Sequence, residues 1–142
     1  MQSSKDTSTI SYDLLAGTVH AFTFHRATRD TTADFMTLYR PVFEGHDRAV
    51  PFKVLIDTRA SGIPSIRSMF SAVRDLYKEH AGNMPEIHIA YLYEDAMMIN
   101  IARSFLEMLR IRSNRRFFEG DQFDTALNWV QNQPQMFATS TD

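Results

Sequence analysis

The feature that most constrains the fold is an alternation of short apolar runs with longer stretches of helical periodicity. Residues 52–57 (FKVLID) and 87–93 (IHIAYLY) are apolar and rich in β-branched and aromatic residues, which is typical of strands buried on both faces. Between them, residues 66–80 place apolar side chains on one narrow stripe at helical spacing. Strands that alternate with helices predict a mainly parallel sheet with right-handed crossovers.

The same alternation extends toward both ends of the chain. Two β-rich runs at 10–15 and 18–26 are joined by Ala16-Gly17, which predicts an N-terminal β-hairpin. A short strand at 116–118 and helices at about 31–44, 96–111 and 121–130 complete the pattern. We therefore predict one α/β domain with a mostly parallel sheet of about five strands, the N-terminal hairpin and about four helices.

Length, composition and charge limit the classes of protein that the chain can belong to. Its 142 residues suit one domain, and we expect a flexible arm at 1–8, the domain at 9–132 and a polar tail at 133–142. Because there is no cysteine, disulfides and thiolate metal sites are excluded, and we expect a cytoplasmic protein. The net charge is -2, and no apolar run approaches the about eighteen residues of a membrane helix. We therefore expect neither a nucleic-acid nor a membrane partner.

The C-terminal third carries a resemblance to a known family. Residues 117–121 (FFEGD) and 126–129 (ALNW) resemble the closing strand, acidic turn and helix of SpoIIAA-like (STAS-type) domains. Residues 54–57 (VLID) resemble the central strand of the same family. The resemblance covers roughly residues 10–131 and implies a SpoIIAA-like fold and a regulatory role through protein contacts.

The segment after the central strand departs from the family pattern. In anti-sigma-factor antagonists of this family, that strand leads into Asp-Ser-Ser-Gly, in which a serine is phosphorylated. This chain has residues 57–62 (DTRASG) there, followed by Ser65 near the expected helix start. Neither Ser61 nor Ser65 reproduces the motif. The resemblance is therefore to a divergent member without the phosphorylatable motif, and phosphorylation of either serine stays open.

Polar residues gather where the predicted parallel strands end. Ligands of such sheets usually bind outside the carboxyl ends of the strands. The candidate binding residues of this polar rim are Asp57, Thr58, Arg59, Ser61, Ser65, Glu94 and Asp95. The rim would suit a cation, a phosphate or a basic side chain of a partner, but the same residue types also serve as ordinary strand ends and helix caps.

We find no motif for catalysis, for a metal or for a cofactor. None of the five histidines pairs at the i, i+4 spacing of a helical zinc site, and no G-x-S-x-G sequence occurs. A phosphoacceptor role for Asp57 would need an acidic pair on an earlier strand and a later lysine, and neither is evident. We predict a protein that is not an enzyme and that binds no metal and no cofactor.

The third predicted helix is more apolar than a helix that covers one face of a sheet needs to be. Its apolar arc spans about 200°, whereas a stripe of somewhat over 100° suffices for such a helix. Either neighbouring helices flank it closely or part of it meets a second subunit, for which a C2 homodimer is the commonest arrangement. The interface candidates are Met97, Ile99, Leu106 and Met108.

Basic residues cluster beside this helix. Arg103, Arg110, Arg112, Arg115 and Arg116 would suit a phosphate or an acidic partner. The alternative is that Arg110 and Arg112 complement the dipole at the helix C-terminus.

Three functions remain open. We favour a non-enzymatic regulatory or protein-interaction module that self-associates. The first alternative is a small-molecule or lipid-binding domain with a pocket lined by strand aromatics. The second alternative is an enzyme with an unrecognised site around Asp57, Glu94 and the histidines.

Overall fold

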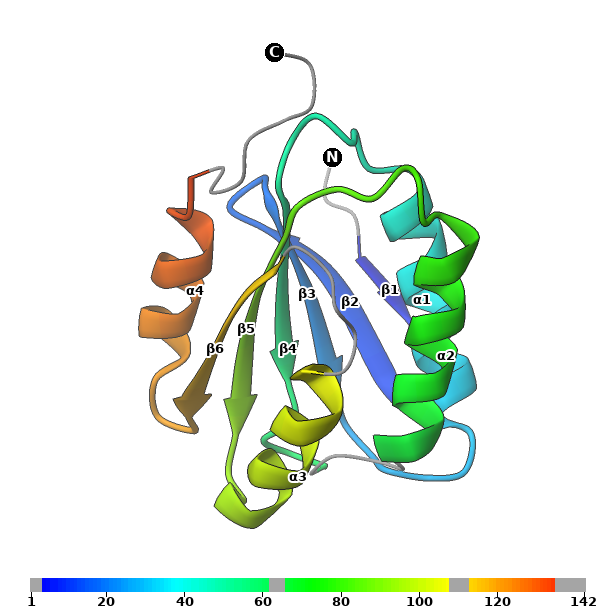
Figure 1. The fold of residues 1–142 in the computed structure, drawn as a ribbon. Coiled ribbons are helices and arrows are strands. Elements are labelled where there is room, and N and C mark those ends of the chain that lie inside the picture. The colour runs from blue at the N-terminus through cyan, green and yellow to red at the C-terminus, as the bar shows by residue number, and fades with distance from the viewer. Residues whose placement is uncertain (1–3, 62–65, 108–112, 135–142) are drawn as a thin grey trace.

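A computed structural model describes residues 4–61, 66–107 and 113–134 of the chain (Figure 1). One sheet contains six strands: β1 (Ser4–Asp6), β2 (Ile10–Leu15), β3 (Val19–Phe24), β4 (Phe52–Asp57), β5 (Ile87–Tyr93) and β6 (Ser113–Glu119). The helices are α1 (Thr31–Glu44), α2 (Ile66–Glu79), α3 (Ala96–Glu107) and α4 (Phe123–Gln131).

The strands lie side by side in the order in which they occur along the chain. β1, β2 and β3 pair antiparallel, whereas β3, β4, β5 and β6 pair parallel. The β2–β3 turn has positive φ at both central residues, 52° at Ala16 and 74° at Gly17, as a tight hairpin with right-handed strand twist requires. The predicted mainly parallel sheet and its N-terminal hairpin are therefore confirmed.

The number of strands differs from the expected five because Ser4–Asp6 forms β1. This strand lies in the stretch for which we expected a flexible arm, so that expectation is wrong for residues 4–6. Lys5 pairs with Tyr12 across the β1–β2 ladder. Such pairing uses backbone groups of an edge strand and needs no apolar residues, which is why the polar N-terminus gave no strand signal.

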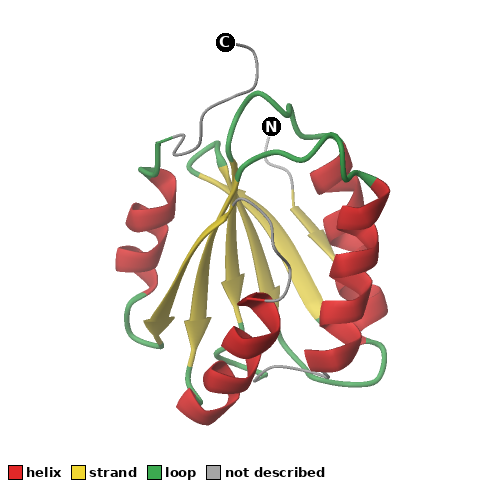
Figure 2. Ribbon diagram, in the orientation of Figure 1, coloured by secondary structure: helices red, strands yellow, loops and turns green. Residues whose placement is uncertain are grey.

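Helices cover both faces of the sheet (Figure 2). α1 and α2 pack on one face, α4 packs on the other, and α3 lies beside α2. Right-handed crossovers between parallel strands added in one direction put the connecting helices α1, α2 and α3 on the same face, and α4, which follows the last strand, covers the other face. β6 is an edge strand, and its parallel neighbour is β5.

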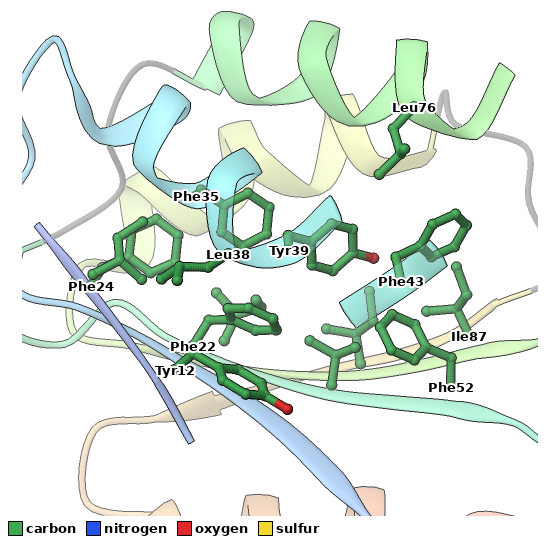
Figure 3. Close-up of a cluster of buried hydrophobic side chains, with 14 of the residues drawn as sticks. Tyr12, Phe22, Phe24, Phe35, Leu38, Tyr39, Phe43, Phe52, Leu76 and Ile87 are labelled. Carbon is green, nitrogen blue, oxygen red and sulfur yellow. The ribbon is translucent and has the colours of Figure 1, made fainter. Parts of the chain in front are cut away.

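The larger core is a layer of aromatic rings between the sheet and α1 (Figure 3). Phe35, Tyr39 and Phe43 recur at every fourth residue of α1, so their rings point to the same side of the helix. The ring centroid of Phe35 lies 4.8 Å from that of Tyr39, and the ring of Phe22 on β3 lies 5.4 Å from that of Phe35. The ring of Phe52 on β4 lies 5.9 Å from that of Tyr39 and 5.8 Å from that of Phe43, on the sheet side of α1 (Figure 3). This layer therefore fixes α1 against the middle of the sheet.

The smaller core lies under α4. Ala126 and Val130 of α4 are fully buried and lie in one cluster with Leu55 and Ala90 of the central strands. Small side chains on both sides let the helix approach the sheet closely. Trp129 is partly buried beside Phe118, with ring centroids 5.9 Å apart. The C-terminal strand and helix thus pack as a closing unit.

Candidate functional site

The buried centre of the polar rim is an ion pair at the end of β4. Arg59 donates from Nε to Oδ1 of Asp57 at 3.0 Å and from Nη2 to Oδ2 at 2.8 Å. The Asp57 side chain is 7% exposed and that of Arg59 is 32% exposed. The backbone amide of Arg59 also donates to Oδ1 at 3.0 Å. Both carboxylate oxygens are therefore bound within the chain, in the two-pronged geometry that arginine favours.

Arg59 also connects β4 to the turn after β6. Its Nη1 donates to the carbonyl oxygen of Gly120 at 2.7 Å, and its guanidinium lies 5.3 Å from the ring centroid of Phe123. A Cβ on Gly120 would overlap the carboxylate of Glu94, so glycine leaves room for that group. Hydrogen bonds to Asp57 and the charges of Asp57 and Glu94 raise the pKa of Arg59. The structure thus brings three predicted rim residues together: Asp57, Arg59 and Glu94.

Other rim residues make local contacts. Thr58 donates from Oγ1 to the carbonyl oxygen of Leu92 at 2.9 Å and thereby ties β4 to β5. Asp95 accepts from the backbone amide of Met97 at 3.0 Å at the start of α3, as a helix cap does. Ser61 lies in the turn after Arg59, and Ser65 lies outside the described residues. The contacts of Thr58 and Asp95 are those of strand ends and helix caps.

What this rim can do chemically depends on the access to the Asp57 carboxylate and on the groups that already bind it. A cation ligand, a phosphoryl acceptor and a general base must each be reached by an ion or a substrate, whereas the Asp57 side chain is only 7% exposed. Arg59 holds both oxygens of Asp57. The Asp57–Arg59 ion pair, together with the Arg59–Gly120 hydrogen bond, ties the end of β4 to the β6–α4 turn, and we call this set of contacts the latch.

An exposed cluster joins the C-terminal ends of α1 and α2. Ligand atoms of Glu44, Glu79 and His80 lie within 4.8 Å of one another, a spacing that would suit a metal ion. Arg40 already donates to Glu44 at 3.1 Å and to Glu79 at 2.9 Å. Hydrogen bonds from His80 and Arg40 lower the pKa of Glu44. An ion-pair network between the two helices accounts for this cluster.

A buried pair that the sequence analysis did not single out lies at the start of β5. Nε2 of His88 lies 2.6 Å from Oε2 of Glu86, and these side chains are 0% and 5% exposed. Burial lowers the pKa of His88, although the charge of Glu86 opposes the effect. Two titratable residues at i and i+2 within an apolar strand share one face, and this spacing is the signal that could have revealed the pair.

His20 occupies the opposite face of the sheet and gives the fold a defined response to acid. Its Nδ1 lies 2.8 Å from the hydroxyl of Tyr12, and its ring meets that of His46 edge to face at 6.1 Å. Burial, and to a lesser extent the charge of His46, lowers the pKa of His20 from 6.5 to about 4. The folded protein therefore keeps His20 neutral over a range in which the unfolded chain takes up a proton.

We expect stability to fall as the pH drops from 6.5 toward 4, because only the unfolded state gains the His20 proton in that range. His20→Gln should reduce this loss by about 2 kcal/mol, a value that allows for partial solvent exposure. Urea unfolding at a series of pH values measures the difference from wild type, and His25→Gln, at an exposed histidine, is the control. Equal acid losses in wild type and His20→Gln would contradict the prediction.

Arginines line a cleft between α3 and β6. A cavity of about 420 Å³ is lined by Arg103, Glu107, Arg115, Arg116 and Phe117, which we call the arginine cleft. Three members of the basic cluster expected from the sequence thus meet at one place. Arg110 and Arg112 of that cluster lie outside the described residues.

The start of α3 presents an apolar side chain to solvent. Met97, one of the interface candidates, is 73% exposed. Ile99 and Leu106 lie on α3, but their side chains are outside the described part of the structure, as is the whole of Met108. In the described ranges, no helix is both long and apolar enough to cross a membrane.

Comparison with known proteins identifies the fold. A crystal structure of an uncharacterized protein from the DUF3478 family of Shewanella loihica PV-4, which has a SpoIIAA-like fold, matches this chain with a TM-score of 0.54. The match covers 92% of each chain at 16% sequence identity. The chain therefore has a SpoIIAA-like fold, as the C-terminal resemblance implied. No protein-family model and no curated protein matches the sequence.

Proposed function

We propose that the protein is a non-enzymatic, STAS-type interaction module that regulates by contact and pairs with a second copy of itself through the start of α3. The observation that carries the proposal is the exposure of Met97, at 73% of its surface, on a helix whose sequence is apolar over an unusually wide arc. Large exposed apolar side chains on such a helix are typical of a contact surface, and methionine adapts to varied partners.

The geometry of the polar rim supports a role without catalysis. Asp57 is the buried carboxylate of the rim, and Arg59 binds both of its oxygens. Thr58 and Asp95 are engaged in strand pairing and helix capping. The rim then serves to hold the β4, β5 and β6 ends in place, and contacts with partners fall to the adjoining surface of α3.

Self-association is tested by sedimentation velocity over a range of protein concentrations. We expect wild type to form dimers, and Met97→Glu to weaken the dimer at least about tenfold, because the contact would bury an unpaired carboxylate. Val50→Glu is the matched control, since Val50 is a large apolar residue that is 48% exposed elsewhere on the protein. A wild-type protein that stays monomeric, or a Met97→Glu dimer as tight as the wild-type dimer, would contradict the proposal.

A small-molecule-binding role is the second candidate. It is favoured by the arginine cleft, whose volume of about 420 Å³ lies within the range of ligand pockets. Native mass spectrometry of the purified protein separates the two candidates. A co-purifying small molecule supports ligand binding, whereas a dimer of the bare chain mass supports self-association.

A further inference from the structure

We infer that the arginine cleft between α3 and β6 is a binding site for a small dianion, a phosphomonoester or a dicarboxylate. The inference rests on the second candidate function, the binding of a small molecule, and not on self-association. The lining of the cleft is rich in basic residues. Among the described residues that line it, three are arginines and one is a glutamate, whereas the whole chain carries a net charge of -2. The cleft is thus a positively charged place on a protein whose net charge is negative.

Arg103 is held in place by an aromatic ring. Its guanidinium carbon lies 4.6 Å from the ring centroid of Phe117. The Phe117 ring in turn stacks on Tyr91 of β5, with centroids 4.9 Å apart and planes 15° apart. An arginine positioned by stacking loses less side-chain freedom when it binds an anion, and its donor fork stays available to oxygen atoms.

The cleft carries positive charge at two depths. Arg115 is only partly exposed, and its charge opposes the rise that burial causes in the pKa of Tyr91. Its charge therefore acts on the interior side of the cleft, whereas Arg103 is exposed at the surface. The Arg116 side chain lies on the other face of β6, with its guanidinium 5.3 Å from the ring centroid of Phe118, so Arg103 and Arg115 supply the cations of the cleft. Two cations at different depths can each contact one charge of a dianion, whereas an anion with one charge at the surface would meet only one of them.

Glu107 gives the inference a distinctive test. Among the described residues that line the cleft, Glu107 is the acidic one, so its carboxylate competes with an anionic ligand for the arginines. Glu107→Gln removes the negative charge and keeps the size of the side chain. A specific site should therefore bind a dianion more tightly after this substitution, and less tightly after Arg103→Gln.

The experiment is a calorimetric titration of the full chain with inorganic phosphate and, separately, with succinate. Both are used as dianions at an ionic strength matched with chloride. We expect Arg103→Gln to weaken binding about tenfold or more, because a charge-assisted hydrogen-bonding group is lost. Glu107→Gln should tighten binding several-fold. The better of the two probes distinguishes a phosphomonoester ligand from a dicarboxylate ligand.

Arg74→Gln is the matched control. Arg74 is an exposed arginine that also lies over a phenylalanine ring, at 5.7 Å from the centroid of Phe70, but it does not line the cleft. This variant changes the net charge as Arg103→Gln does and should bind both probes as wild type does. Thermal unfolding of each variant shows that the fold is kept. Equal weakening by Arg103→Gln and Arg74→Gln, or no heat of binding with either probe, would overturn the inference.

Discussion

Replacement of Arg59 by methionine should lower the free energy of unfolding by about 3 kcal/mol at neutral pH. The substitution removes the partner of Asp57, whose side chain is 7% exposed, and leaves its carboxylate buried without a counter-charge. It also removes the hydrogen bond to the carbonyl oxygen of Gly120. Because the Arg59 side chain is itself 32% exposed, we expect a loss near the lower end of the range for breaking a buried ion pair, about 3–5 kcal/mol.

Urea unfolding of two further variants separates the ion pair from simple loss of packing. Asp57→Asn combined with Arg59→Met leaves no buried charge, so it should restore about 1–2 kcal/mol of the loss. Arg74→Met removes an exposed arginine and should change stability by less than about 0.5 kcal/mol. If Arg59→Met costs no more than Arg74→Met, the latch does not stabilise the fold.

The largest loss is expected from Phe43→Ala, at about 4 kcal/mol. Phe43 is fully buried at the end of α1, where its ring lies 5.3 Å from that of Tyr77 on α2 and 5.8 Å from that of Phe52 on β4. The substitution leaves a cavity where two helices and the sheet meet. The guanidinium of Arg48, 4.6 Å from the ring centroid, adds about 0.5–1 kcal/mol, so loss of packing is the dominant cause.

Chemical denaturation measures this effect, with Val50→Ala as its control. Val50 is 48% exposed, so its truncation should change stability by less than about 0.5 kcal/mol. If Phe43→Ala lowers the free energy of unfolding by less than about 2 kcal/mol, neighbouring aromatic side chains have moved to fill the space left by the Phe43 ring. Such a result would contradict close packing of the aromatic layer between α1 and the sheet (Figure 3).

Several parts of the fold could be predicted because their signals are local in sequence. Continuous apolar runs identified β4 and β5, which are buried on both faces, and apolar residues at helical spacing identified α2, which is buried on one side. The hairpin was predicted from the short link Ala16-Gly17 between two β-rich runs, because glycine adopts the positive φ that a tight turn requires, here 74° at Gly17. β1 was not predicted, because an edge strand that forms by backbone pairing needs no particular pattern of side chains.

The sequence showed which residues could form the candidate sites, but it did not show which groups those residues contact. Asp57 and Arg59 are two residues apart, and their proximity to the end of β4 was predicted from the strand pattern. Their engagement with each other could not be predicted, because the same residues on the same strand end could equally have faced solvent. The likeness of the fold to a SpoIIAA-like protein does not settle this point, since 16% identity concerns the backbone arrangement.

The sequence by itself determined the order and type of the main elements, because hydrophobic periodicity records the burial of each segment. Only the tertiary structure decided which groups meet. Arg59 binds Gly120 across 61 positions of the chain because β4 and β6 lie on either side of β5 and end at the same edge of the sheet. Arg103 reaches Phe117 because the crossover from β5 to β6 sets α3 next to its own following strand. These contacts depend on sheet order, which local periodicity does not encode.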